Sequence, residues 1–221
     1  MEEIHAPIPA AKELFDLSHT VAKELFENAD NVYDVLSGIG DFAKKLGEKL
    51  EKEGTHKQIA PMVWVAEGVK IAEFSTVIGP TVIGKGTEIR PGAYIRGNAI
   101  IGEGAVIGNS TEIKNAIIFD GAQLPHYNYV GDSVIGHRAH LGAGAIISNF
   151  RLDHSSIKIR VGDEKIDTGL RKMGAMIGDF TEIGCGSVIS PGSIIGKGCM
   201  LYPLTSFVGI LDEGTRYKKD R

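Results

Sequence analysis

The chain has 221 residues, of which 29 are glycine and only 7% are aromatic. Glycine therefore makes up about 13% of the chain, against about 7% in an average protein. The hydrophobic share of 43% and the charged share of 24% are ordinary for a folded protein, which excludes a disordered chain and a collagen-like fibre. A net charge of −4 gives no overall attraction to nucleic acid or to an anionic membrane.

The amino terminus lacks the features of a secretion signal. Residues 1–10 carry acidic residues and two prolines where a signal peptide has basic residues followed by an apolar run. No stretch reaches the roughly 18 apolar residues of a membrane span. The two cysteines, Cys185 and Cys199, do not indicate a disulfide framework in a chain of this length. We therefore expect a cytoplasmic protein with neither membrane nor nucleic acid as a partner.

Residues 1–58 are expected to form an α-helical segment. Apolar residues recur at helical spacing from Leu14 to Leu25 and again from Val32 to Leu50. Residues 28–31 form a plausible break between the two runs, so the pattern predicts two amphipathic helices.

From Val65 onward the sequence repeats with a period of six residues. A branched aliphatic residue stands at every sixth position, and a small residue usually follows it four positions later. The aliphatic positions are Val65, Ile71, Val77, Ile83, Ile89, Ile95, Ile101, Ile107 and Ile113, then Ile135, Leu141 and Ile147, and then Ile177, Ile183, Ile189 and Ile195. An α-helix cannot keep residues six apart on one face over so many repeats, whereas short strands that turn a corner every six residues can.

This period is typical of hexapeptide-repeat proteins. The resemblance implies a mainly β fold, a left-handed parallel β-helix over residues 59–221 with three strands in each coil. The aliphatic residues would point inward, and glycine would permit the tight corners at Gly84, Gly102, Gly108, Gly136 and Gly184. Because an open end of such a helix exposes unpaired backbone, the segment 1–58 is interpreted as a cap or an oligomer contact.

The first interruption of the period, residues 119–134, is expected to leave the coil. It lies between Ile113 and Ile135, which are 22 residues apart where 18 or 24 would keep the phase. It contains His126, whose imidazole can act as a general base near neutral pH. A histidine hydrogen-bonded locally in its loop is the alternative.

The second interruption, residues 148–176, is expected to project as a hairpin with its turn at residues 162–165. Ile157, Ile159 and Val161 alternate there with charged residues. The segment also carries basic residues that either receive the phosphates of a ligand or form a solvated face. They are Arg151, Lys158, Arg160, Lys165, Arg171 and Lys172.

Between residues 88 and 198, several motifs follow one another in an order that is known from one family. They are Ile89-Arg90-Pro91-Gly92-Ala93, Glu112-Ile113-Lys114, His126-Tyr127-Asn128-Tyr129-Val130-Gly131-Asp132, Leu141-Gly142-Ala143-Gly144, Ser148-Asn149-Phe150 and a last stretch over residues 171–179. Over about half its length the chain resembles the acyltransferase half of the bifunctional glucosamine-1-phosphate acetyltransferase/N-acetylglucosamine-1-phosphate uridyltransferases. It is more similar still to the C-terminal β-helix of archaeal-type sugar-1-phosphate nucleotidylyltransferases.

The resemblance implies an acetyl-CoA-dependent N-acyltransferase acting on an amino-sugar 1-phosphate or a nucleotide amino sugar. It makes His126 the general base for the amine and Asn149 the residue that orients the amine or the acetyl group. Backbone N–H groups of residues 142–145 are expected to stabilise the oxyanion. The substrate-binding residues that it implies are Arg90, Lys114, Tyr129 and, where the family has an asparagine, His140.

Coenzyme A is implied as the co-substrate, with no metal. Its pantetheine arm is expected to pass Ala143 and Cys185, and its phosphates to lie at Lys158 and Arg171. Cys185 stands where related enzymes have a serine. The resemblance also implies a homotrimer whose sites lie between subunits.

Two other interpretations stay open. The relatives' nucleotidyltransferase domain has no counterpart before Val65, because about 60 residues are too few for a nucleotide-binding domain. Nucleotidyltransferase activity is therefore not expected, and the chain could instead be a non-catalytic module that binds sugar phosphates or nucleotide sugars, or an assembly partner of a separately encoded sugar nucleotidyltransferase. A zinc-dependent lyase is suggested by His126, His137, His140 and His154. However, His137 and His140 are three residues apart, and residues at that spacing in a six-residue repeat face different walls of the coil.

Overall fold

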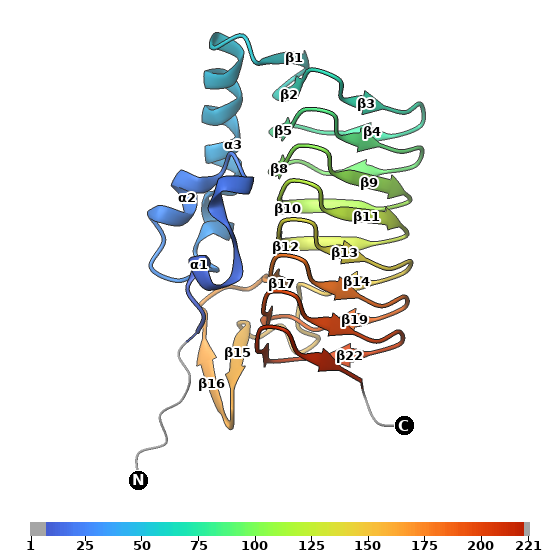
Figure 1. Cartoon of the computed structure of the whole chain (residues 1–221). Coiled ribbons are helices and arrows are strands. Elements are labelled where there is room, and N and C mark those ends of the chain that lie inside the picture. The colour runs from blue at the N-terminus through green and yellow to red at the C-terminus, as the bar shows by residue number, and fades with distance from the viewer. Residues whose placement is uncertain (1–7, 219–221) are drawn as a thin grey trace.

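In the computed structural model, which describes residues 8–218, the chain winds into a parallel β-solenoid of about nine turns with a few helices beside it (Figure 1). Most strands pair in parallel with the strands at the same position in the turns before and after. The expected hexapeptide-repeat β-helix is confirmed. The first seven residues of the expected segment 1–58 and the last three of the expected segment 59–221 lie outside the described residues.

The strands form three faces. The first face is made of β2 (Val63–Ala66), β5 (Thr81–Ile83), β8 (Ala99–Ile101), the second halves of β10 (Glu112–Ile118) and β12 (Tyr129–Ile135), β17 (Ala175–Ile177), β20 (Ser193–Ile195) and β23 (Ile210–Leu211). The second face is made of β3 (Lys70–Ile71), β6 (Glu88–Ile89), β9 (Val106–Asn109), β11 (Gln123–His126), β13 (His140–Leu141), β18 (Glu182–Ile183), β21 (Met200–Leu201) and β24 (Arg216–Tyr217). The third face is made of β4 (Thr76–Val77), β7 (Tyr94–Ile95), the first halves of β10 and β12, β14 (Ile146–Ile147), β19 (Val188–Ile189) and β22 (Ser206–Phe207).

The aliphatic positions of the period fill the inside of the solenoid. Ile83, Ile101, Ile118 and Ile135 lie directly above one another in register on the first face. All four are fully buried, and so are the small residues Ala93, Ala99 and Ala105 at the corners between faces. The six-residue pattern therefore stacks identical side chains into one continuous apolar core.

Residues 119–134 do not leave the coil, so the expected excursion there is wrong. Ile113 pairs with Val130 and Ile118 pairs with Ile135, so these partners lie 17 residues apart, one fewer than Ile83 and Ile101 in an earlier turn. The shortening occurs because β10 and β12 each run around a corner without a loop, with one residue of positive φ at the bend. These residues are Asn115 (φ 48°) and Asp132 (φ 49°). The aliphatic series thus continues through Leu124.

The expected reason for the corner glycines also needs correction. Gly84 and Gly184 do not have a positive φ; a Cβ at Gly184 would lie 2.4 Å from the backbone nitrogen of Pro203 in the next coil. The positive φ values fall on other glycines, such as Gly86 (φ 69°). Glycine is thus required at positions such as Gly184 because stacked coils approach each other closely there.

Residues 148–174 form an excursion between β14 and β17. It contains the antiparallel hairpin of β15 (Lys158–Val161) and β16 (Glu164–Asp167), whose turn follows Val161. Ile157 and Ile159 are fully buried against apolar side chains on the outside of the first face.

The helices cover the outside of the first face. They are α1 (Ala11–Leu14), a 3₁₀-helix at Leu17–His19, α2 (Lys23–Glu27) and α3 (Val35–Lys52), followed by β1 (His56–Ala60), which pairs antiparallel with β2. The first expected helix is therefore broken into short pieces, and the second corresponds to α3. Figure 1 shows α3 running alongside the stacked strands, so the helical segment does not cap an end of the solenoid. Its apolar side packs on outward-facing residues of the first face, such as Trp64, Val82 and Ile100.

Candidate functional site

A cavity of about 270 Å³ lies on the third face, where the excursion leaves and rejoins the solenoid. It is lined by Arg96, Lys114, Tyr129, Asn149, Phe150 and Lys172. Three consecutive coils supply the first three, because Tyr94, Glu112 and Tyr129 are in register on β7, β10 and β12. The other three come from the two ends of the excursion. The cavity therefore exists only because residues 148–174 depart from the coil at this point.

The floor of the cavity is a network of hydrogen bonds around Asp132. Lys114 Nζ lies 3.1 and 3.0 Å from the two carboxylate oxygens of Asp132. The side-chain amides of Asn115 and Asn149 donate to the same carboxylate. Only 5% of Asp132 is exposed, so its charge is stabilised by these donors rather than by water.

Tyr129 stands at the cavity wall as a neutral hydroxyl. Burial, with smaller contributions from Glu112 and Asp132, raises its pKa above the usual 10.0. The space beside it is tight, since a Cβ at Gly131 would lie 2.6 Å from both Tyr129 Oη and Asn149 Nδ2. Gly131 thus allows the tyrosine and the asparagine to lie side by side.

Two cations in this cavity were not singled out as substrate ligands by the sequence. Arg96 donates to Glu112 at 2.7 Å, and Lys172 has no partner among the described residues. Lys172 was expected only as a member of the basic cluster. The period offers a signal for Arg96, which lies one six-residue side after Arg90 and hence on the next face.

Arg90 and His140 do not line this cavity within one chain. Arg90 directly follows β6 on the second face and forms an ion pair with Glu88 at 3.2 Å. His140 lies on β13 of the same face, with its Nδ1 at 2.8 Å from Glu182. Both side chains are thus separated from Lys114 by a corner of the coil.

His126 stands at the end of β11, on the edge between the second and third faces. Its imidazole is exposed and has no hydrogen-bond partner among the described residues. The corner is held by Asn128, which is buried and donates to the carbonyl oxygen of Gly142 at 2.9 Å. Strand β12 starts on the other side of this corner with Tyr129, which lines the cavity.

Ala143 and Cys185 follow His126 along this edge in the next two coils. Gly144 N donates to the carbonyl of His126, and Gly186 N donates to the carbonyl of Ala143. Both Ala143 and Cys185 are exposed. Since neighbouring strands are about 4.8 Å apart, the edge from His126 to Cys185 spans roughly 10 Å.

The expectation that N–H groups across residues 142–145 are free for an oxyanion is wrong for three of them. Gly142 N, Gly144 N and Ala145 N all donate to main-chain carbonyls, of Ile183, His126 and Gly142. The N–H of Ala143 has no partner among the described residues. The bonds of Gly142 and Gly144 join stacked coils, and that of Ala145 closes the turn within its own coil.

A larger groove of about 590 Å³ lies farther along the third face, beneath the hairpin. Its basic lining residues are Arg151, Lys158, Arg160 and Lys165. Phe150 lines both this groove and the smaller cavity. Arg171 is exposed and lines neither, so the structure divides the basic cluster of the excursion.

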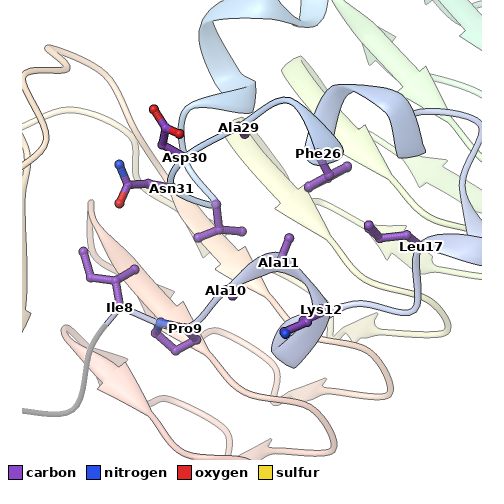
Figure 2. Close-up of a pocket in the computed structure, with 11 residues that line it drawn as sticks. Ile8, Pro9, Ala10, Ala11, Lys12, Leu17, Phe26, Ala29, Asp30 and Asn31 are labelled. Atoms are coloured by element: carbon purple, nitrogen blue, oxygen red, sulfur yellow. The ribbon is translucent and has the colours of Figure 1, made fainter.

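Figure 2 shows a third cavity, of about 270 Å³, between the start of the described chain and the α2–α3 connection. Its walls include Ile8, Ala11, Leu17 and Phe26, and it contains none of the expected site residues. Across residues 8–218, no three or more His, Cys, Asp or Glu side chains are grouped so that they could bind a metal ion. In the same range, no helix has the length and hydropathy needed to cross a membrane.

The chain is similar to several known proteins. Residues 77–168 match the family model described as the GMPPB C-terminal domain. A bifunctional sugar-1-phosphate nucleotidylyltransferase/acetyltransferase of Sulfurisphaera tokodaii is 42% identical over 94 residues, which are 42% of this chain and 23% of that protein. The bifunctional protein GlmU of Methanococcus maripaludis (strain C5) is 34% identical over 96% of this chain and 52% of that protein. The chain thus spans about half the length of these relatives or less.

Among solved structures, a hexapeptide transferase family protein from Anaplasma phagocytophilum aligns with 69% of this chain and 72% of its own, at 19% identity and a TM-score of 0.41. The sequence similarity and the stacked six-residue sides of the solenoid both indicate a hexapeptide-repeat fold. The chain is built of stacked hexapeptide repeats and resembles the C-terminal region of the GlmU-type bifunctional proteins.

Proposed function

We propose that this protein is an acetyl-CoA-dependent N-acyltransferase that acts on an amino-sugar 1-phosphate or a nucleotide-linked amino sugar. One observation carries the proposal. The cavity that joins Lys114, Tyr129 and Asn149 begins one corner away from the exposed imidazole of His126. The names of the bifunctional relatives, which combine sugar-1-phosphate nucleotidylyl transfer with acetyl transfer, agree with this chemistry.

In the proposed reaction, His126 accepts a proton from the substrate amine. The amine nitrogen forms a bond to the thioester carbonyl carbon, the C–S bond breaks, and coenzyme A leaves as a thiolate that the imidazolium can protonate. The N–H of Ala143, in the adjacent coil, has no partner within residues 8–218 and is suited to donate a hydrogen bond to the oxyanion of the tetrahedral intermediate. Asn149 orients the acceptor amine.

The cavity suits a sugar phosphate. Arg96, Lys114 and Lys172 bring three cations to its lining, of which Lys172 is unpaired among the described residues. Tyr129 offers a neutral phenolic donor because its pKa is raised. Charge-assisted hydrogen bonds of this kind are strong for phosphate oxygens.

Coenzyme A would lie along the edge formed by His126, Ala143 and Cys185, with its phosphates in the basic groove at Lys158. A pantetheine arm is long and extended, which suits an edge of three stacked coils. Because Phe150 lines both the groove and the sugar cavity, the two substrates would approach each other at this side chain.

The test is release of free thiol from acetyl-CoA in the presence of glucosamine 1-phosphate or galactosamine 1-phosphate. His126→Ala should reduce turnover by about 100-fold or more, as expected for the loss of a general base. Gln123→Ala, an exposed residue on the same strand β11, should keep wild-type turnover. If calorimetry shows sugar-phosphate binding without coenzyme A binding, and neither sugar supports thiol release, a non-catalytic binding module replaces this proposal.

A further inference from the structure

The carboxylate of Asp132 is a buried charge beneath the candidate sugar cavity. It lies at the bend of β12 with a φ of 49°, and only 5% of the residue is exposed. A carboxylate in such a place requires donors on both oxygens. It has three donating side chains, of which Lys114 and Asn115 are neighbours on β10 and Asn149 lies at the start of the excursion.

Two of these donors are also cavity residues. Lys114 Nζ contacts both carboxylate oxygens, at 3.1 and 3.0 Å, and Asn149 Nδ2 contacts Oδ2. Lys114 is carried by β10, whereas Asn149 begins the excursion after β14. One carboxylate therefore fixes two side chains that belong to separate segments of the chain.

The contact to Asn149 also decides which end of its amide is free. Because Nδ2 donates to Asp132, the amide oxygen of Asn149 is the group left to accept a hydrogen bond from a ligand. An asparagine whose amide could rotate would present either group. An acceptor at this position suits the N–H of an amine.

The charge of Asp132 also matters for the cations around the cavity. Arg96 is paired with Glu112 and Lys114 is paired with Asp132, so Lys172 is the cation without a partner among the described residues. Asp132 thus offsets the attraction of Lys114 for an anion while holding its ammonium group in place.

We propose that Asp132 is a positioning residue. It holds the Lys114 ammonium and orients the Asn149 amide so that the amide oxygen accepts a hydrogen bond from the substrate amine. This inference rests on the proposed acyl transfer. Asp132 does not touch the reacting atoms. Asn115, which also donates to Asp132, supports the carboxylate from the side of α3 at 3.0 Å.

Kinetics of Asp132→Asn test this role. We expect kcat to fall by about 10- to 100-fold, because small misplacements of an orienting group cost that much. KM for glucosamine 1-phosphate should stay within about threefold, since Lys172 and Tyr129 are unchanged and the loss of the carboxylate leaves Lys114 less fixed but more attractive to phosphate. The kcat of the double variant Asp132→Asn/Asn149→Ala should be no lower than that of Asn149→Ala, because the effect of Asp132 on kcat passes through the Asn149 amide, whereas Lys114 contributes to binding of the phosphate. Full additivity of the two effects would overturn the proposal, and so would an unchanged kcat.

Asp179→Asn is the matched control. Asp179 is also buried and accepts hydrogen bonds from the backbone nitrogens of Asp16 and His137, away from the cavity. It should lose stability but keep kcat and KM within about twofold. A purely structural role for Asp132 would make the two variants behave alike.

A second readout needs no turnover. In protein labelled with ¹⁵N-asparagine, the side-chain amide signal that Asn149→Ala removes should be protected from solvent exchange in the wild type and lose that protection in Asp132→Ala. If the wild type transfers no acetyl group, the proposed function fails and this signal alone decides the role of Asp132. Equal protection in both proteins would overturn it.

Discussion

The side-chain amide of Asn115 donates a hydrogen bond of 3.1 Å to the main-chain carbonyl of Leu36, 79 residues earlier in the chain. The same nitrogen donates to Asp132 at 3.0 Å. One asparagine therefore connects helix α3 to the floor of the sugar cavity. The helices consequently support the candidate site from behind, although they contribute no residue to its lining.

Replacing Asn115 should weaken the contact between α3 and the solenoid. Asn115→Gly keeps the positive φ of 48° accessible but removes both donated hydrogen bonds. We expect the free energy of unfolding to fall by about 2 kcal/mol, since each bond contributes about 1 kcal/mol. Urea unfolding followed by the fluorescence of Trp64, the single tryptophan, measures it.

Asn98→Gly is the control for this change. Asn98 also has a positive φ, of 49°, but is exposed. Its replacement should change the free energy of unfolding by less than about 0.5 kcal/mol, as at other surface positions. Equal losses in both variants would contradict the role given to Asn115.

The packing of α3 on the first face gives a second prediction. Gly47 faces Trp64, and a Cβ there would overlap the indole ring. Glycine to alanine normally stabilises a helix by about 1 kcal/mol. Gly47→Ala should instead destabilise the protein by about 1–3 kcal/mol, because the indole must move and its hydrogen bond to Glu51 is strained.

Gly40→Ala is the matched control in the same helix. Its Cβ would meet only the side chain of Asn98, which is exposed and can rotate away. In thermal unfolding, Gly40→Ala should lose no more than about 0.5 kcal/mol of stability relative to the wild type, whereas Gly47→Ala should be clearly less stable. A stabilised Gly47→Ala would show that α3 can lift away from the first face at little cost.

Much of the fold follows from the sequence because a six-residue period has one physical solution. Ile83, Ile101 and Ile135 can share one column only if each turn has three sides. The expected excursion at 119–134 is wrong because the 22 residues from Ile113 to Ile135 contain two sides of five residues, which the strict period of six does not predict. A corner made by one residue with positive φ, as at Asn115, leaves no mark in the hydrophobic pattern.

The candidate site could be predicted only in part. Motifs name Lys114, Tyr129 and Asn149, which the structure brings to one cavity. They do not show that Arg90 points along the second face, because a resemblance carries no information on which face a residue occupies. The position of Lys172 depends on where the excursion returns to the coil, and spacing along the sequence does not fix that.

Gly131 gives a prediction on the site itself. Because a Cβ there would lie 2.6 Å from Tyr129 Oη and Asn149 Nδ2, Gly131→Ala should displace both side chains. We expect at least about a tenfold loss in kcat/KM for the amino-sugar phosphate. Gly136→Ala is equally crowded, at 2.6 Å from Asp179 N, but remote from the cavity. It should lower stability and leave kcat/KM of the folded protein within about twofold.

The carboxyl group of Asp120 should make stability depend on pH. Burial raises its pKa above the usual 3.8, against the opposing effect of the hydrogen bond from Glu103 N. A carboxyl group whose pKa is raised on folding stabilises the protein most below its unfolded pKa, and this contribution is lost as pH rises through the folded pKa. The protonated nearby imidazole of His19, with Nδ1 at 3.9 Å, would oppose part of this effect.

Asp120→Asn removes the ionisable group but keeps an oxygen that can accept from Glu103 N. The stability of the variant relative to the wild type should therefore increase as pH rises from about 4 to 7. Urea midpoints over this range measure the difference. Asp41→Asn, which removes an exposed carboxylate from α3, controls for net charge. A difference that shrinks with rising pH would show that Asp120 is stabilised by its partners when ionised.

The last prediction concerns the basic groove beneath the hairpin. Arg151 is engaged by Asp153, whose pKa it holds well below the usual range, and Lys158 lies 3.9 Å from Asp167. Arg160 and Lys165 have no partner among the described residues and stand opposite each other on β15 and β16. Like charges placed opposite each other destabilise a hairpin, so a bound anion would relieve a repulsion that the fold already contains.

The triple variant Lys158→Ala/Arg160→Ala/Lys165→Ala should therefore bind coenzyme A about tenfold or more weakly, by calorimetry, while the hairpin is no less stable. Wild-type binding should weaken as salt rises from about 50 to 300 mM, and the variant should lose most of this dependence because exposed charges are screened. Arg171→Ala, an exposed arginine of the same excursion outside the groove, should bind like the wild type. If Arg171→Ala weakens binding and the triple variant does not, the phosphates lie outside this groove.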